Sequence, residues 1–211
     1  AVSANIYNML VRTFASAVAG IDAVTVTIEV NVSQGIRFFL VGLPDVAVKE
    51  SQQRIESAIR TLGYHWPGRQ VVVNMAPADI RKEGSAYDLP LAAGILAADG
   101  KISRNDLESF ILMGELSLDG TLQPVRGVLP IALRAREEGF KGVILPSRNA
   151  REAAVVNGLE VFGGVGLLSD DPALAHLIAE WSPLDPTLGA GWGLMGLRGF
   201  MLPAAQMTPA A

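Results

Sequence analysis

A ten-residue stretch, Ala23–Val32, alternates branched apolar residues with polar ones at a period of two. This is the pattern of a strand with one face buried and the other facing solvent. A turn at Ser33–Gly35 and a second apolar run at Arg37–Val41 predict an antiparallel hairpin with that strand. The chain therefore requires a sheet, and other segments must cover its apolar face.

The segments that follow supply candidate helices and further strands. An apolar face recurs at helical spacing after Asp45, whose carboxylate is a suitable N-cap. Helices are expected over Asp45–Leu62, Leu89–Ala98, Val128–Glu138, Asn149–Val156 and Pro172–Glu180. Strands are expected over Gln70–Asn74, Gly142–Leu145 and Leu159–Phe162, and over Phe110–Met113 and Thr121–Val125, which a turn at Asp119–Gly120 is expected to join as a hairpin. The sequence thus predicts an α/β fold, with a mixed sheet and packed helices in two layers.

Composition excludes several classes of protein. Half of the 211 residues are hydrophobic and 18% are charged, which excludes a wholly disordered chain. The absence of cysteine excludes disulfides and thiolate metal sites, and His65 and His176 are too few and too isolated for a histidine metal site. No apolar run is long enough to span a membrane, and no secretory signal is visible, so we expect a cytoplasmic protein. The net charge of −4 argues against a generally basic nucleic-acid binder, but it allows a local basic patch.

Phosphate-binding loops are not found. The only Gly-Lys pair, Gly100–Lys101, lacks the upstream glycine and the following Ser or Thr of a nucleotide-binding loop. Gly163–Gly166 lacks the third glycine of a dinucleotide loop. We therefore expect no ATP hydrolysis by this chain, and no cofactor or metal bound to it.

The segment Arg81–Leu91 is the most informative for chemistry. Its Gly-Ser step precedes a helix, where a hydroxyl lies in the field of the helix N-terminus, as serine nucleophiles require. The alternative is that Ser85 and Asp88 only cap that helix, and the residues alone favour this alternative.

A second candidate surface is basic. Between positions 49 and 82, six basic residues stand against three acidic ones, Glu50, Glu56 and Asp79. Clustered cations of this kind bind nucleic-acid phosphates, and Tyr64, His65 and Trp66 are placed to stack on bases. The DNA-binding candidates are Lys49, Arg54, Arg60, Arg69, Arg81 and Lys82.

Each part of this basic surface also has an ordinary structural interpretation. The cations form a solvated helix face if Lys49 and Glu50 interact with Arg54, or if Glu56 pairs with Arg60 at i,i+4. The three aromatic residues then cover an edge of the core. The sequence alone leaves both interpretations open.

Five separated motifs resemble the N-terminal domain of the ComM/YifB family, which are bacterial Mg-chelatase-like AAA+ proteins. The motifs are Phe14–Gly20, Val41–Asp45, Val73–Asp79, Lys82–Pro90, and Gly114–Gly127 together with Leu145–Asn149. The resemblance covers about residues 9–180. Met9–Arg12 resembles the usual start of the family, so residues 1–8 are expected to be an N-terminal extension.

The resemblance implies a fold and a context. The family domain is similar to the proteolytic domain of Lon protease and to the C-terminal domain of RadA. Full-length family members carry an ATPase module after this domain, where ATP and Mg²⁺ are expected to bind. ComM is implicated in DNA branch migration during natural transformation, so DNA and further copies of the chain in a ring are the expected partners. That module is absent from these residues, and the irregular segment 181–211 is expected to be either a flexible tail or, as the resemblance favours, a truncated or frameshifted end.

The Lon likeness raises the question of peptidase chemistry. Lon-type sites use a serine at the start of one helix and a lysine near the start of a later helix as its base. The matching register places Ala86 at the serine position, with Ser85 one residue early, and Leu129 at the lysine position. The nearby Arg126 and Arg134 stay protonated and cannot replace that base. The resemblance therefore implies a non-catalytic domain for assembly, DNA engagement or both, with a degenerate serine peptidase or a pure oligomerisation module as alternatives.

Overall fold

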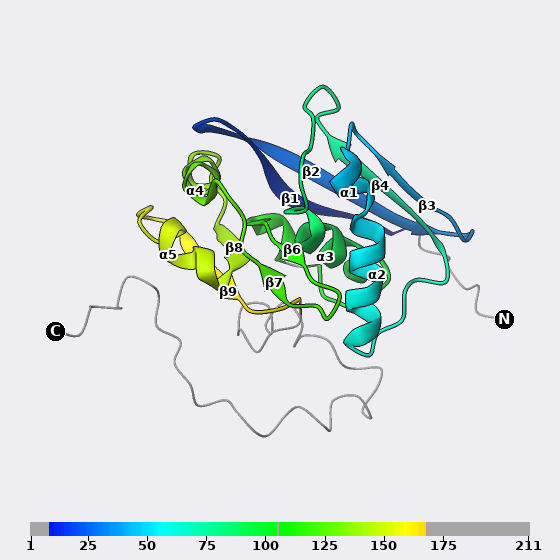
Figure 1. Cartoon of the computed structure of the whole chain (residues 1–211). Coiled ribbons are helices and arrows are strands. Elements are labelled where there is room, and N and C mark those ends of the chain that lie inside the picture. The colour runs from blue at the N-terminus through cyan, green and yellow to red at the C-terminus, as the bar shows by residue number, and fades with distance from the viewer. Residues whose placement is uncertain (1–8, 105, 168–211) are drawn as a thin grey trace, which may run out of the picture.

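The computed structural model describes residues 9–104 and 106–167, and these form a seven-stranded sheet with helices packed on it (Figure 1). The strand order is β3-β4-β2-β1-β5-β8-β9, and β2 runs antiparallel to both of its neighbours, while the other pairings are parallel. The strands are β1 Met9–Ala19, β2 Asp22–Ser33, β3 Phe38–Val41, β4 Gln70–Ala76, β5 Phe110–Leu112, β8 Gly142–Pro146 and β9 Glu160–Gly164. A separate hairpin pairs β6 Glu115–Leu116 with β7 Leu122–Gln123.

The helices fall on the predicted segments, but the single helix predicted over Asp45–Leu62 is divided at Glu50, and the one predicted over Asn149–Val156 is only four residues long. They are α1 Val46–Lys49, α2 Ser51–Thr61, α3 Asp88–Ala98, α4 Val128–Glu137 and α5 Ala150–Ala153, with short 3₁₀ helices η1 Leu107–Ser109 and η2 Ser147–Asn149. The predicted helix over 172–180, the extension 1–8 and the tail 181–211 lie outside the described residues, as does His176. None of the helices described is long and apolar enough to cross a membrane.

Strand β2 confirms the alternation seen in the sequence. Val26, Ile28 and Val30 are completely buried, while the intervening Thr27 and Glu29 remain partly exposed. Its partner differs from the prediction. The hairpin forms with β1, through a tight turn at Gly20, and β4 occupies the other side of β2.

The predicted pairing of the strand at 37–41 with β2 is therefore wrong. This segment is β3, the edge of the sheet, and it pairs in parallel with β4. Strand β1 could not be recognised as the partner of β2 from its sequence, because its central run of alanine and serine residues shows little difference in hydrophobicity between the two faces of the strand. The prediction that the strand at 110–113 forms a hairpin with the one at 121–125 is also wrong, since β5 joins the large sheet and the Asp119–Gly120 turn connects β6 with β7.

Helix α3 lies at the centre of the core, and all eleven of its residues are buried. It packs closely on the sheet, since a Cβ at Gly94 would lie 2.7 Å from Val30 Cγ2. Thr13 Oγ1 of β1 donates to the carbonyl oxygen of Pro90 at 3.0 Å, which fixes the face of the sheet that α3 covers.

Helix α4 contacts the other face of the β1–β2 hairpin. Phe14 follows Thr13 and therefore points the opposite way, and its ring meets that of Phe140, directly after α4, with centroids 5.1 Å apart. Thr25 Oγ1 of β2 donates to Glu138 Oε2 at 2.6 Å. The expected α/β class, with a mixed sheet and packed helices, is confirmed (Figure 1). In addition to the two layers that were predicted, α4 covers part of the face of the sheet opposite to α3.

Candidate functional site

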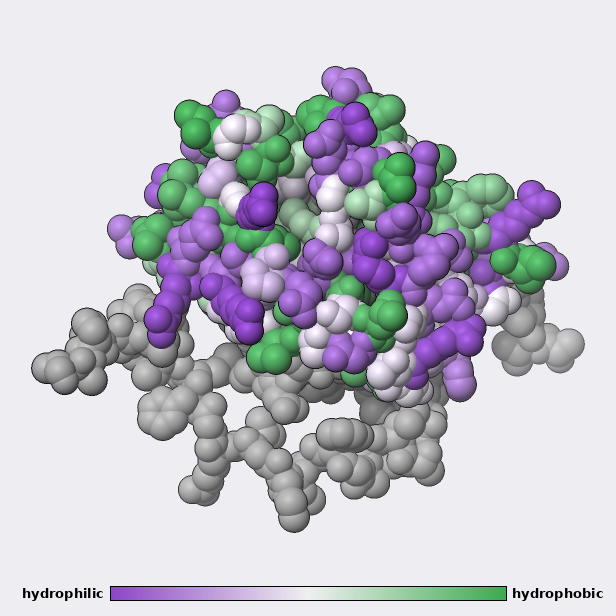
Figure 2. Space-filling model, in the orientation of Figure 1, coloured by the Kyte–Doolittle hydropathy of each residue, from purple (hydrophilic) through white to green (hydrophobic). Residues whose placement is uncertain are grey.

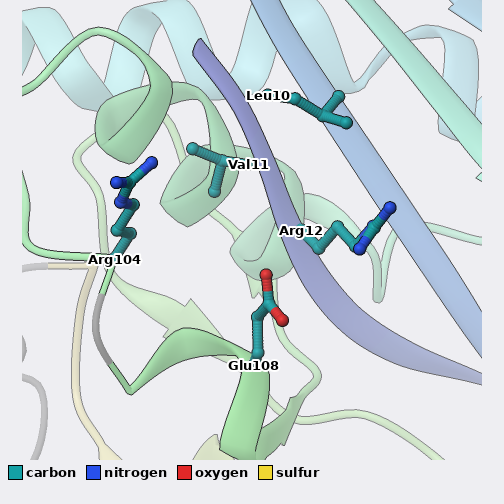
Figure 3. A pocket seen from close by; sticks show the side chains of 5 residues that line it. All are labelled: Leu10, Val11, Arg12, Arg104 and Glu108. Atoms are coloured by element: carbon teal, nitrogen blue, oxygen red, sulfur yellow. The ribbon is translucent and has the colours of Figure 1, made fainter.

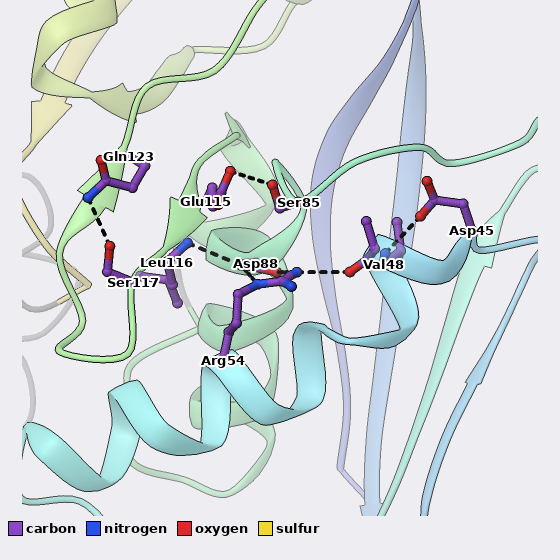
Figure 4. A network of polar contacts seen from close by, with 10 residues as sticks. Asp45, Val48, Arg54, Ser85, Asp88, Glu115, Leu116, Ser117 and Gln123 are labelled. Atoms are coloured by element: carbon purple, nitrogen blue, oxygen red, sulfur yellow. Dashed lines mark hydrogen bonds and ion pairs between the residues drawn. The ribbon is translucent and has the colours of Figure 1, made fainter.

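The loop before α3 is held against the start of α1. The side chain of Asp45 accepts a hydrogen bond from Val48 N at 2.8 Å, which confirms the predicted N-cap, and another from Gly84 N at 3.0 Å. The backbones of the two loops also bond, from Asp45 N to the carbonyl oxygen of Lys82 at 3.0 Å. One carboxylate thus positions both the first helix and the Gly-Ser step (Figure 4).

The hydroxyl of Ser85 donates to Glu115 Oε2 of β6. It does not cap α3, and neither does the side chain of Asp88, so the capping interpretation is wrong for both side chains. Instead the backbone of Gly114 accepts from Leu89 N at 2.9 Å. The N–H group of Leu89, in the first turn of α3, is therefore bound by the carbonyl oxygen of Gly114 and not by a capping side chain.

Asp88 belongs to a buried ion pair that the sequence did not reveal. Its two carboxylate oxygens accept from Arg54 Nε and Nη2 at 2.7 and 2.9 Å, and Leu116 N donates to Oδ2 at 3.1 Å. The side chain of Asp88 is completely buried and that of Arg54 is 19% exposed. Arg54 also reaches the carbonyl oxygen of Ala47 at 2.9 Å. These bonds join α1, α2, α3 and the β6–β7 hairpin (Figure 4).

The ion pair alters the titration of both partners. Burial raises the pKa of the Asp88 carboxyl above its usual range, while the hydrogen bonds from Arg54 and Leu116 act in the opposite direction. The same carboxylate raises the pKa of Arg54. The guanidinium group therefore stays charged, and its charge is directed at Asp88 rather than at solvent.

The positions that match the Lon-type serine and lysine do not assemble a dyad. Ala86 and Leu129 have no titratable group, so neither position can supply a nucleophile or a base. Ser85 lies three residues before α3, and Leu129 is the second residue of α4. The amide of Leu129 donates to Glu152 Oε1 at 3.1 Å. The two matching positions therefore hold an alanine and a leucine in place of the serine and lysine of a Lon-type dyad.

Lys82 is a second buried cation in this region. Its ammonium group donates to the carbonyl oxygen of Pro77, and the residue is completely buried. Burial lowers the pKa of Lys82, and the nearby Asp79 carboxylate partly opposes this shift. The amine of Lys82 and the hydroxyl of Ser85 therefore have different hydrogen-bond partners, although they are three positions apart.

The six basic candidates do not form one exposed surface. Lys82 is buried and Arg54 is bound to Asp88, so neither presents its charge to a phosphate on the surface. The predicted interaction of Arg54 with Lys49 and Glu50 is replaced by that ion pair. Only the remaining four of these six residues carry a positive charge that faces solvent.

The other four basic candidates are exposed. Arg60 pairs with Glu56 at 2.7 Å, which confirms the predicted i,i+4 pair. Arg81 pairs with its neighbour Glu83 at 3.2 Å. Lys49 and Arg69 are exposed, and they have no ion pair with a described residue. The patch is therefore weaker than the charge count indicated.

The aromatic residues beside Arg69 cover the core. The Trp66 ring lies 6.0 Å from that of Phe38, and burial raises the pKa of Tyr64. Both residues pack against the buried cluster, as the structural interpretation predicted, while His65 is exposed.

A shallow pocket of about 280 Å³ lies at the start of β1, away from Ser85 (Figure 3). Its lining combines two arginines, Arg12 and Arg104, with Glu108 and two aliphatic side chains. Arg12 also bonds to Glu29 at 3.3 Å, so cations and carboxylates are balanced there. Within residues 9–104 and 106–167, no group of three or more acidic or histidine side chains is arranged to hold a metal ion.

Comparison with known proteins gives concordant matches. A family profile described as subunit ChlI of Mg-chelatase matches residues 28–149. The chain is 41% identical to YifB of Escherichia coli over 143 residues, which is 67% of this chain and 28% of that protein. It is 40% identical to the competence protein ComM of Haemophilus influenzae over 156 residues, which is 74% of this chain and 30% of that protein.

A weaker match supports the Lon-like fold. Lon protease 2 of Bacillus subtilis is 30% identical over 114 residues, which is 54% of this chain and 20% of that protein. The chain spans less than a third of the length of each of these relatives. The profile match and the two 40% relatives confirm the resemblance expected from the five motifs. The chain belongs to the Mg-chelatase ChlI-like family that includes YifB and ComM.

Proposed function

We propose that this chain is the non-catalytic, Lon-like N-terminal domain of a ComM/YifB-type AAA+ protein, and that it contributes to ring assembly and DNA engagement. The observation that carries the proposal is the environment of Ser85. Its hydroxyl is bonded to a carboxylate, and an aliphatic residue, Leu129, stands where a Lon-type site has its lysine. ATP and Mg²⁺ would bind elsewhere in such a full-length protein, which we expect to be cytoplasmic.

Ser85 lacks the activation that peptide hydrolysis requires. A serine nucleophile needs an adjacent base strong enough to take its proton. Glu115, its hydrogen-bond partner, offers a carboxylate, which is a much weaker base than a neutral amine. Asp88 is occupied by Arg54 and Leu116, and the amine of Lys82 is directed at Pro77. These contacts support a structural role for the former catalytic region.

An apolar sheet edge supports the assembly part of the proposal. Phe39 and Val41 of β3 are 40% and 48% exposed, and Leu43 and Val46 beside them are 53% and 70% exposed. β3 is also an edge strand, whose outer backbone groups are available to another strand. Contiguous exposed apolar surface of this kind is typical of interaction sites.

Two measurements on the 211-residue chain test the proposal. Peptide hydrolysis by the wild type and by Ser85→Ala is expected to be equal and at background. A rate that Ser85→Ala abolishes would establish the degenerate-peptidase alternative instead. Sedimentation at micromolar concentration is expected to show self-association that Phe39→Ser with Val41→Ser weakens, and a wild type that stays monomeric would contradict the assembly role.

DNA engagement is tested by titrating labelled single- and double-stranded DNA into the same chain at several salt concentrations. Binding that weakens linearly in log K against log salt is expected, because phosphate contacts release counterions. The competence protein ComM among the relatives is consistent with such a role. Absence of binding at low salt would leave assembly as the domain's contribution.

A further inference from the structure

Three exposed arginines flank the place where η2 and α5 pack against the segment before α4: Arg126 precedes α4, and Arg148 and Arg151 lie three positions apart in η2 and α5. We call Arg126, Arg148 and Arg151 the arginine cluster. The side chain of Asn149 joins the two backbone segments that carry them, because it accepts from Val125 N and donates to the carbonyl oxygen of Val125, both at 2.9 Å. Arg126 directly follows one end of this contact and Arg148 directly precedes the other. Helix α5 lies at the left of Figure 1, next to α4.

The contact that holds the arginine cluster is rigid. Asn149 is 7% exposed and Val125 is 9% exposed, so both hydrogen bonds are shielded from water. The helix beside them is fixed as well, since the α5 residue Glu152 accepts from Leu129 N in the first turn of α4. Arg151 lies one helical turn from Arg148, so the two are neighbours on the surface. The three backbone positions are therefore preorganised.

The charges of the cluster are not neutralised. All three arginines are exposed, and none forms an ion pair or hydrogen bond with another described residue. In contrast, Arg12, Arg54, Arg60, Arg81 and Arg134 each have a carboxylate partner. Glu152, next to Arg151, forms no ion pair with any of the three, and its Oε1 accepts from the Leu129 amide. Figure 2 shows hydrophilic and hydrophobic residues intermingled on this side of the molecule.

We propose that the arginine cluster is the surface through which this domain contacts the phosphate backbone of nucleic acid. Guanidinium groups form bidentate hydrogen bonds with phosphate, and unpaired ones do so without first breaking an ion pair. Contacts of this type fix the position of the strand and carry no base specificity. This inference rests on the DNA engagement proposed above and names its site.

The test compares two variants that lose the same charge. The first is Arg126→Gln/Arg148→Gln/Arg151→Gln. The control is Arg37→Gln/Lys49→Gln/Arg69→Gln, which removes three exposed cations without ion pairs near the β3–β4 end of the sheet. Labelled DNA is titrated into the wild type and both variants at several salt concentrations, and circular dichroism melts verify folding. A polyglutamate chain of matched charge is the competing probe.

The cluster variant is expected to bind DNA about tenfold or more weakly, with a salt slope smaller by about 2 to 3, while the control keeps most of the wild-type affinity. Equal losses in the two variants, or a loss confined to the control, would overturn the assignment of the site and leave DNA engagement intact. Polyglutamate that binds the cluster more tightly than DNA does would assign it to an acidic protein instead. If the wild type fails to bind DNA at low salt, both the proposed DNA engagement and its assignment to the arginine cluster are refuted.

Discussion

The buried ion pair offers the sharpest perturbation of this fold. In Asp88→Asn an amide oxygen at the Oδ2 position still accepts from Leu116 N and Arg54 Nε, but the amide nitrogen at the Oδ1 position presents N–H groups to Arg54 Nη2, which is also a donor. The guanidinium group, whose side chain is 19% exposed, then loses its carboxylate. The variant therefore removes one charge and leaves the shape of the site almost unchanged.

The expected loss of stability follows from the burial of the two partners. Removing one member of a buried pair costs roughly 3–5 kcal/mol, because the other charge stays buried without compensation. Arg54 retains its bond to Ala47 and some contact with solvent, so the loss is expected near the lower limit, about 3 kcal/mol. For a domain of this size that loss lowers Tm by roughly 6–12 °C.

Urea unfolding of the wild type and the variant measures the free energy directly. Glu56→Gln is the matched control, since it makes the same chemical change at the exposed partner of Arg60 and is expected to cost about 0.5 kcal/mol or less. Arg54→Met combined with Asp88→Asn is expected to recover at least about 1 kcal/mol, because no buried cation remains. An Asp88→Asn loss as small as that of Glu56→Gln would refute the reasoning.

Three further changes test the packing and the buried charges. Gly94→Ala is expected to destabilise the domain by about 1–2 kcal/mol in urea unfolding, because its Cβ would lie 2.7 Å from the buried Val30. Lys82→Met is expected to stabilise it at neutral pH, since burial lowers the pKa of Lys82 and the folded state carries the cost of its charge. That advantage shrinks as the pH rises towards about 10, because the folded state loses this proton before the unfolded state does. Asn149→Ala is expected to cost about 2 kcal/mol in the same assay and to weaken DNA binding, since it leaves the buried backbone groups of Val125 without partners.

Each of these outcomes has a result that contradicts it. Gly68→Ala, at a glycine with open space around it, is the control for Gly94→Ala, and equal effects would argue against close helix–sheet packing. A Lys82→Met difference that does not change between neutral and alkaline pH would exclude a buried cation. Unchanged stability in Asn149→Ala would show that its two hydrogen bonds do not hold the arginine cluster in place.

The residues alone predicted much of the local structure. The alternation in β2, the apolar faces of α2 and α4 and the wholly apolar α3 identified these elements, because side-chain periodicity is set by backbone geometry. The N-cap at Asp45 was also predictable, since its hydrogen bond reaches only three residues along the chain. The five motifs led to the family, and with it to the α/β fold.

Contacts between segments that are distant in the sequence could not be predicted from local sequence patterns. The position of β3 depends on β1 and β4 occupying both sides of β2, and no local pattern encodes that competition. Arg54 was counted as a surface cation because its partner is 34 positions away, and Lys82 because its burial depends on the loop around it.

The sequence by itself determined which segments are helices and strands, which residues are apolar enough to form a core, and which family the motifs resemble. Only the tertiary structure decided which charges face solvent. Asp88 neutralises Arg54 inside the fold, whereas the bond between Asn149 and Val125 gathers Arg126 and Arg148 at the surface. The physical reason is that a charge is available to a partner only where packing leaves it hydrated and unpaired, and packing is a property of the whole chain.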